Sequence, residues 1–226
     1  MKWPFALPMQ HLFRPAPPAP PVAVATKPVA PTPADAPDGK RALRNPGLFF
    51  NIARAVTGPL NQRQVDTINR LLAGAAHWPT AWLAYGLATA WHEARLQPIP
   101  EWGKGRGRPY AKAGKYGQPQ YGRGLVQLTW DRNYEWADKA LGLGGALLRD
   151  FDLALDPDIA ARILIRGMET GAFTGKSLSS YLTGGAGTHE QFRQARRIIN
   201  GMDKADRIAT YADRFQAALS AGDWRD

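Results

Sequence analysis

The segment Thr80–Arg95 is apolar on almost every side of the helix that it predicts. Pro79 stands just before it, a place where proline is tolerated because the first backbone N–H groups of a helix have no partner within the helix. A helix that is apolar all round must be buried, so the rest of the chain has to pack around it. This segment therefore predicts a domain built on a central helix.

Capping signals and helical periodicity predict further helices around this one. Their expected extents are Asn61 to Gly74, Asp156 to Gly171, Thr188 to Ile199 and Asp203 to Leu219. Strand signals are few: residues 121–130 leave room for a short extended piece, and the glycine-rich stretch 103–124 predicts a loop or a small hairpin. We therefore expect a mainly α-helical fold.

Prolines crowd residues 14–40, at positions 15, 17, 18, 20, 21, 28, 31, 33 and 37. Proline cannot donate a backbone hydrogen bond, so this composition predicts an extended, solvated spacer. We accordingly expect a disordered Pro-rich arm at residues 1–44 and one folded domain at residues 45–226. Residues 1–13 are either a frayed tail or a short docking peptide, and two prolines interrupt any export-signal core there.

Composition narrows the classes of partner. The chain has no cysteine, and its four histidines are not at metal-ligand spacing, so we expect no metal and no cofactor. No stretch approaches the roughly 18 to 20 apolar residues of a transmembrane segment. The net charge of +10 favours polyanionic surroundings, such as nucleic acid, anionic lipid or an acidic cell wall. No nucleic-acid-binding motif accompanies the charge, so we expect no nucleic-acid partner.

Glu93 stands near the end of the predicted central helix, among residues that suit the interior. Burial of a carboxylate is expensive, and both the helix dipole and the loss of water favour the neutral, protonated form. A carboxyl group that is held protonated is suited to act as a general acid. The structural alternative is a side chain that has reached solvent or that pairs with Arg95.

Glu101 follows on a segment that leaves the helix beyond Pro98 and Pro100. Hydrolysis of a glycosidic bond uses two carboxyl groups, one that protonates the leaving oxygen and one that activates water or attacks the sugar carbon. Glu93 and Glu101 are therefore a candidate pair. The structural alternative for Glu101 is an ordinary solvated loop charge.

Several separate motifs accompany this pair. They are His92-Glu93, Glu101, Tyr-Gly-Arg-Gly-Leu-Val-Gln-Leu-Thr-Trp at 121–130, Asn133-Tyr134, Ile-Ile-Asn-Gly at 198–201 and Ala-Asp-Arg-Ile at 205–208. With these motifs in this order, the region from about Asn61 to Leu219 resembles glycoside hydrolase family 19, which includes plant chitinases and many bacteriophage endolysins. The resemblance implies a lysozyme-like, two-lobed helical domain with a substrate cleft.

The resemblance also implies roles for individual residues. Glu93 falls on the general acid and Glu101 on the general base of an inverting reaction, in which water attacks directly. Thr129 falls where the family helps to hold that water. The positions implied to line the sugar groove or to support the glutamates are Tyr121, Gln127, Trp130, Asn133, Asn200 and Arg207. Trp102 and Trp130 stand beside the motifs, where an indole ring can stack on a sugar.

The path from Glu93 to Tyr121 is shorter than in plant chitinases, which predicts fewer substrate subsites. It carries five basic residues, Lys104, Arg106, Arg108, Lys112 and Lys115. Positive charge suits the carboxylates of peptidoglycan better than neutral chitin, unless these residues are ordinary solvated loop charges. We therefore expect an endo-acting hydrolase of the β-1,4 bonds of peptidoglycan, an endolysin or a wall-remodelling enzyme.

Two other hypotheses stay open. One is a chitinase that uses the same glutamates, and the other is a tethered virion-associated or wall-binding module with weak catalysis. In each case we expect a monomer whose partner is a polysaccharide. The protein would reach the wall either by release from a host cytoplasm during lysis or by export.

Overall fold

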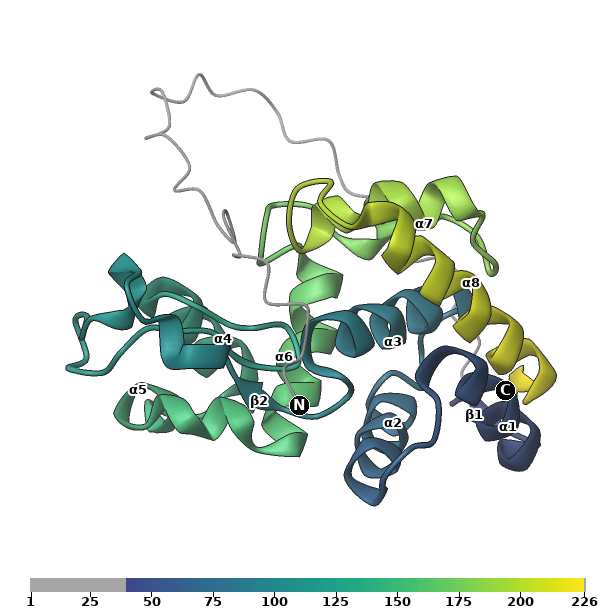
Figure 1. Cartoon of the computed structure of the whole chain (residues 1–226), viewed down its shortest axis with the longest axis horizontal. Helices are drawn as coiled ribbons and strands as arrows, with labels where there is room; N and C mark the ends of the chain where they lie inside the picture. Colours follow the sequence, from purple (N-terminus) through teal and green to yellow (C-terminus); the bar gives the residue numbers. More distant parts are fainter. Residues whose placement is uncertain (1–39, 226) are drawn as a thin grey trace.

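The computed structural model describes residues 40–225 of the chain (Figure 1). Within this part eight α-helices dominate, joined by short 3-10 turns and loops. Their bounds are α1 Pro46–Thr57, α2 Gln62–Gly74, α3 Thr80–Ala94, α4 Asp131–Leu141, α5 Ala146–Arg149, α6 Pro157–Thr170, α7 His189–Ala195 and α8 Ala205–Ala221. The prediction of a mainly α-helical fold is confirmed. The arm expected before residue 40 lies outside the described residues, and no described helix is long and apolar enough to cross a membrane.

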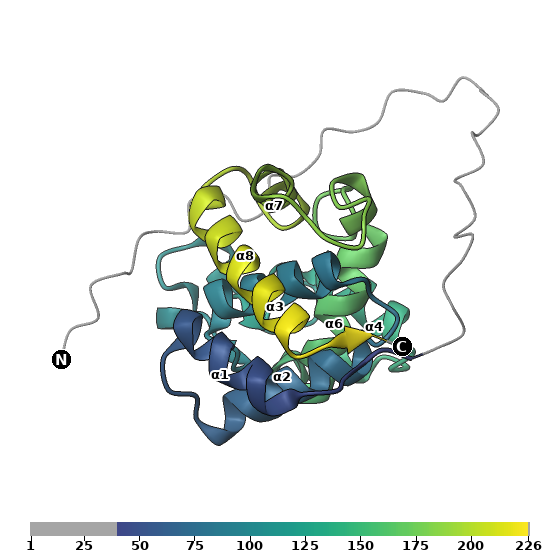
Figure 2. The same ribbon diagram turned by 90° about the vertical axis from the view of Figure 1, so that its right-hand side faces the viewer.

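Helix α3 is the centre of the packing, as its sequence predicts. Nearly all its side chains from Ala81 to Trp91 are buried, and it packs against α8, α2 and α6 (Figure 2). The helix ends where Arg95 adopts a left-handed conformation with φ 52°. Helix α8 also contacts α1 and α7, so the last helix covers much of the core. Because α3 packs against several helices, these neighbours determine the position of Glu93 in its final turn.

The predicted capping boxes are present. In α2 the Asn61 side chain accepts from the Gln64 N–H at 3.0 Å, and the Gln64 side chain accepts from the Asn61 N–H at 2.9 Å. Thr188 and Gln191 form the same reciprocal pair at the start of α7. Asp156 caps α6, which ends at Gly171. These local signals correctly placed the starts of three helices.

Three helices, α1, α4 and the single-turn α5, were not predicted. Helix α1 begins with Asn45, whose side chain accepts from the Leu48 N–H at 3.1 Å, followed by Pro46 in the first turn. Helix α4 starts after Trp130, which has a φ of 72° and provides no side-chain cap. The first helix carries ordinary start signals, whereas the second depends on the conformation of the preceding turn.

A short antiparallel pair ties the beginning of the described chain to its end. Strand β1, Ala42–Leu43, pairs with β4, Trp224–Arg225. Just before β1, the Arg41 N–H donates to the carbonyl of Ala76 at 2.8 Å. Residues 41–44 are thus attached to the helical domain, and the folded part begins before the predicted boundary at residue 45.

A second antiparallel pair organises the glycine-rich region. Strand β2, Ile99–Pro100, pairs with β3, Arg123–Gly124, so that the segment between them forms one long loop with both ends side by side. An isolated bridge joins Ala113 to Pro119 within this loop. The expectation of a loop or small hairpin, with a short extended piece after residue 120, is confirmed.

Candidate active site

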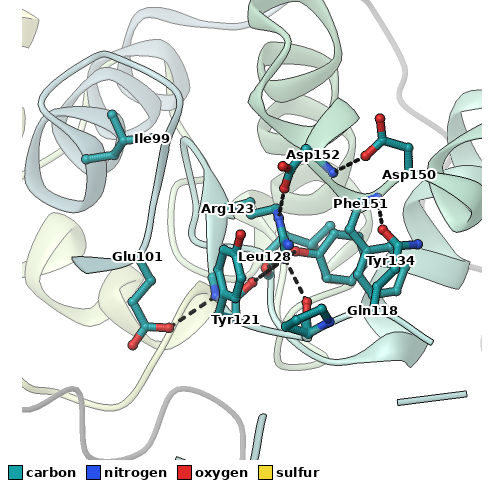
Figure 3. A network of polar contacts seen from close by, with 12 residues as sticks. Ile99, Glu101, Gln118, Tyr121, Arg123, Leu128, Tyr134, Asp150, Phe151 and Asp152 are labelled. Atoms are coloured by element: carbon teal, nitrogen blue, oxygen red, sulfur yellow. Dashed lines mark hydrogen bonds and ion pairs between the residues drawn. The ribbon is translucent and has the colours of Figure 1, made fainter. Parts of the chain in front are cut away.

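The carboxylate of Glu101 is held by two donors at the base of this loop. The Tyr110 hydroxyl donates to Glu101 Oε1 at 2.9 Å, and the Gly122 N–H donates to Oε2 at 3.2 Å. The Glu101 N–H donates in turn to the carbonyl of Gly122 at 2.7 Å. Figure 3 shows the side chain directed toward the turn that carries Tyr121. Glu101 is therefore a partly buried, oriented carboxylate and not a free loop charge.

Tyr110 owes its position to a glycine. A Cβ atom added to Gly105 would lie 2.7 Å from Tyr110 Cε2 and 3.3 Å from Tyr121 Cβ, and the φ of Gly105 is 67°. Burial, together with the hydrogen bond to Glu101, raises the pKa of Tyr110 to about 12. The hydroxyl therefore remains a hydrogen-bond donor at neutral pH. No local pattern in the sequence indicated Tyr110, which lies nine residues beyond its partner.

Thr129 and Gln127 lie beside Gly122, the residue whose N–H binds Glu101. A Cβ atom added to Gly122 would lie 3.3 Å from Thr129 Oγ1 and 3.0 Å from Gln127 Oε1. The Thr129 hydroxyl donates to the carbonyl of Gln127 at 2.8 Å. The structure therefore places Thr129 in the neighbourhood of Glu101, on the same turn.

Gln127 and Asn133 bind the backbone of this turn. Gln127 Nε2 donates to the carbonyls of Ile99 and Gly124, both at 3.1 Å, which fastens β2 to β3. Asn133 Nδ2 donates to the carbonyl of Thr129 at 2.6 Å. Both side chains are buried. Of the two roles that the resemblance implied, supporting the site and lining a groove, their amide nitrogens serve the first.

A buried arginine stabilises the same turn (Figure 3). Arg123 Nε lies 2.6 Å from Asp152 Oδ1, and its Nη1 donates to the Tyr134 hydroxyl and to the carbonyls of Pro119 and Tyr121, each at 3.0 Å. The guanidinium also lies 3.6 Å from the centre of the Tyr121 ring. Tyr121 is thus buried beneath Arg123 as a packing residue. Sequence reasoning missed Arg123, although it stands inside the Tyr-Gly-Arg-Gly motif.

Glu93 is almost fully buried and forms an ion pair. Arg196 Nη1 lies 2.7 Å from Glu93 Oε1, and the side chains are 3% and 4% exposed respectively. Arg196 Nε also donates to the carbonyl of Asp203 at 3.0 Å. Arg95, the expected alternative partner, lies instead over the Trp91 ring at 4.7 Å. The partner of Glu93 was not predicted, although Arg196 stands only two residues before the quoted Ile-Ile-Asn-Gly motif.

His92 and the C-terminal motifs complete the surroundings of Glu93. Burial lowers the pKa of His92, and the positive charges of Arg196, Arg95 and Arg207 act in the same direction, while Glu93 opposes them. Arg207 is an exposed residue of α8. Asn200 accepts from the Gly201 N–H at 2.8 Å and thereby shapes its own turn. The Arg207 charge thus acts on His92, and Asn200 has a local structural role.

The two tryptophans beside the motifs differ in exposure. Trp130 is half-buried and packs edge-on against Tyr110, with ring centres 5.6 Å apart. Trp102 is 90% exposed. Among the basic residues of the loop, Lys104, Arg106 and Lys112 are exposed, while Lys115 pairs with Glu135 at 3.0 Å. The loop thus presents an indole ring and several cations to solvent beside Glu101.

Comparison of the chain with protein-family models and with curated proteins finds no match. Within residues 40–225, no three acidic or histidine side chains gather to hold a metal ion.

Proposed function

We propose that the protein is an endo-acting glycoside hydrolase that cleaves β-1,4 bonds of peptidoglycan, with Glu93 as general acid and Glu101 as general base. One observation carries the proposal: the two glutamates have sharply different environments. Glu93 is buried against Arg196, whereas Glu101 is partly exposed and bound by neutral donors. Two carboxyl groups with different partners can take different roles, as an acid and a base in one site do.

Glu101 has the features of a base that activates water. Its two hydrogen bonds fix the orientation of the carboxylate, and the remaining lone pairs can accept a proton from water. Thr129 lies on the adjoining turn, where its hydroxyl oxygen is available to help hold that water. In the proposed step, the water oxygen bonds to the anomeric carbon while Glu101 takes the proton.

Glu93 then supplies a proton to the leaving oxygen as the glycosidic bond breaks. This leaves Glu93 as a carboxylate, whose charge Arg196 stabilises at the observed separation of 2.7 Å. Solvent returns the proton from Glu101 to Glu93 and resets the site. Arg196 thus stabilises the carboxylate form of Glu93, which is the form that follows proton donation.

We further propose that the domain is lysozyme-like, with a substrate cleft between two lobes. In Figure 1, α4 and α5 lie on one side, α1 and α8 on the other, and α3 and α6 between them. Glu93 belongs to α3, and Glu101 to the loop that extends toward α4. An arrangement in which each glutamate comes from a different side of a cleft would let both reach one bound glycan.

The charge of the loop favours peptidoglycan over chitin. Lys104, Arg106 and Lys112 are exposed on the loop that follows Glu101. Peptidoglycan carries carboxylates on its lactyl ethers and peptides, and these would be attracted by the loop. Chitin remains the second candidate substrate, and weak catalysis in a wall-binding module is the third hypothesis.

The test is to incubate the protein with purified peptidoglycan and with chitin oligomers, and to identify new reducing ends by mass spectrometry. Proton NMR of a freshly cleaved oligomer should show the α-anomer first, because inverting enzymes place water between carboxyl groups roughly 6.5 to 9.5 Å apart. An initial β-anomer would overturn the inverting assignment. Full activity of Glu101→Ala would remove Glu101 from the mechanism, and hydrolysis of neither polymer would overturn the proposed function.

A further inference from the structure

Trp102 differs from every other tryptophan in residues 40–225. Trp78, Trp91 and Trp224 are buried and three others are half-buried, whereas Trp102 is 90% exposed. An indole is the largest apolar side chain, and it contributes a large contact area when a ligand covers it. A ring left in solvent is therefore a candidate binding surface.

The backbone that carries this ring is held in place. The Lys104 N–H donates to the carbonyl of Glu101 at 2.9 Å, and the Arg108 N–H donates to that of Gly105 at 2.8 Å. Gly105 is buried against Tyr110, whose hydroxyl reaches back to Glu101. The loop from Glu101 to Tyr110 is thus closed on itself, so the base of the indole has a defined position before any ligand arrives. Preorganisation of this kind reduces the entropy lost on binding.

The position of Trp102 in the chain is a second argument for a binding role. Trp102 directly follows Glu101 in the chain, so the indole is attached to the backbone next to the proposed catalytic base. Trp130, the other candidate for stacking, already packs its ring against Tyr110. Flat apolar faces that match an indole occur on the C–H side of a pyranose ring.

We propose that Trp102 is a saccharide-binding platform, on which one ring of a β-1,4-linked N-acetylated amino sugar stacks next to Glu101. This inference rests on the proposed function for the identity of the glycan. Of the two tryptophans that the sequence suggested for stacking, Trp102 and Trp130, it assigns the role to Trp102. The shared ligand chemistry is the amino-sugar ring, which occurs in both peptidoglycan and chitin.

The experiment measures binding separately from hydrolysis. Calorimetric titration of the full chain with chitotriose and with a purified peptidoglycan tetrasaccharide, at low temperature, gives the affinity for each source of sugar. Trp102→Ala should bind about 5- to 10-fold more weakly, the loss of one aromatic contact, and Trp102→Phe should recover part of this. Leu48→Ala, which truncates another exposed apolar side chain on α1, is the matched control and should bind like the wild type.

The outcomes separate this inference from the proposed function. Unchanged affinity of Trp102→Ala for both sugars overturns the inference, even if the wild type hydrolyses peptidoglycan. Binding that depends on Trp102 in a wild type without hydrolytic activity supports the platform and contradicts the enzyme. A wild type that binds neither sugar overturns the platform as well. Because Trp102 is almost fully exposed, the Ala variant should keep the melting temperature of the wild type, which verifies that its fold is intact.

Discussion

Arg196 Nη1 lies 2.7 Å from Glu93 Oε1, and the two side chains are at most 4% exposed. The pair joins the last turn of α3 to the turn after α7, across 103 residues of sequence. A buried charge without its partner is strongly destabilising, so each residue is tied to the stability of the other.

Glu93→Gln should abolish hydrolysis and also lower the free energy of unfolding, by about 3 kcal/mol, because Arg196 keeps its buried charge. Urea denaturation and assays of peptidoglycan hydrolysis measure the two effects.

The double variant Glu93→Gln/Arg196→Met should regain part of the stability and none of the activity. Glu190→Gln, at an exposed pair with Arg193, should leave stability unchanged. More than about a tenth of the wild-type rate in Glu93→Gln would contradict a general acid, whose usual contribution is 100-fold or more.

Tyr110→Phe removes the hydroxyl donor to Glu101 and keeps the ring that packs on Trp130. We expect kcat to fall roughly 10-fold or more, since hydrogen bonds to charged groups contribute about 1.5 to 3 kcal/mol, while KM changes little. Tyr116→Phe is the matched control, because Tyr116 donates to Glu135, a carboxylate outside the proposed site, at 2.8 Å. Equal kcat values for the two variants would show that Tyr110 does not orient the base.

Gly105→Ala should damage the loop more than Gly107→Ala. Both glycines have positive φ, 67° and 79°, so both substitutions carry the penalty of a left-handed conformation, about 1 to 2 kcal/mol. Only the Cβ atom at 105 would collide with Tyr110, whereas nothing lies within 4 Å of the one at 107. Melting temperature and activity should therefore both fall further in Gly105→Ala. Indistinguishable variants would mean that the contact between Gly105 and Tyr110 does not matter.

His92 should contribute to loss of stability in acid. Burial lowers its pKa in the folded state, so the unfolded chain takes up the proton first as the pH falls through the ordinary histidine pKa of about 6.5. Stability is thus full above this pH and decreases below it. The melting temperature of His92→Gln should consequently fall less than that of the wild type between about pH 7 and pH 5. Parallel melting curves across this range would contradict the prediction.

Local patterns predicted three of the helices that begin with their own capping residues, α2, α6 and α7. Two of these helices begin with a reciprocal capping pair, Asn61 with Gln64 and Thr188 with Gln191. Because each pair lies within one helical turn, a few consecutive residues are enough to predict it. Helix α4 was missed because its start depends on the conformation of Trp130, whose N–H donates to the carbonyl of Gln120. That contact follows from the long loop and not from a local preference.

The two carboxylates of the candidate site could be proposed from the sequence, whereas the residues that bind them could not. A glutamate inside an apolar helix stands out in a sequence, as Glu93 does. Its pairing with Arg196 is a contact between distant segments, and the hydrogen bond between Tyr110 and Glu101 requires a loop to close on itself. The resemblance singled out Gln127 and Asn133 as polar residues of the site. In the structure their amide nitrogens bind backbone carbonyls.

The central helix is covered largely by the last one. Helix α8 ends at Ala221, and β4 pairs with β1 only after it, so the first and last described segments meet in the finished fold. During synthesis on the ribosome, the apolar surface of α3 emerges long before the residues that shield it. The nascent chain must therefore keep this apolar helix from aggregating until α8 has been synthesised, and a pause in translation before α8 would prolong the exposure.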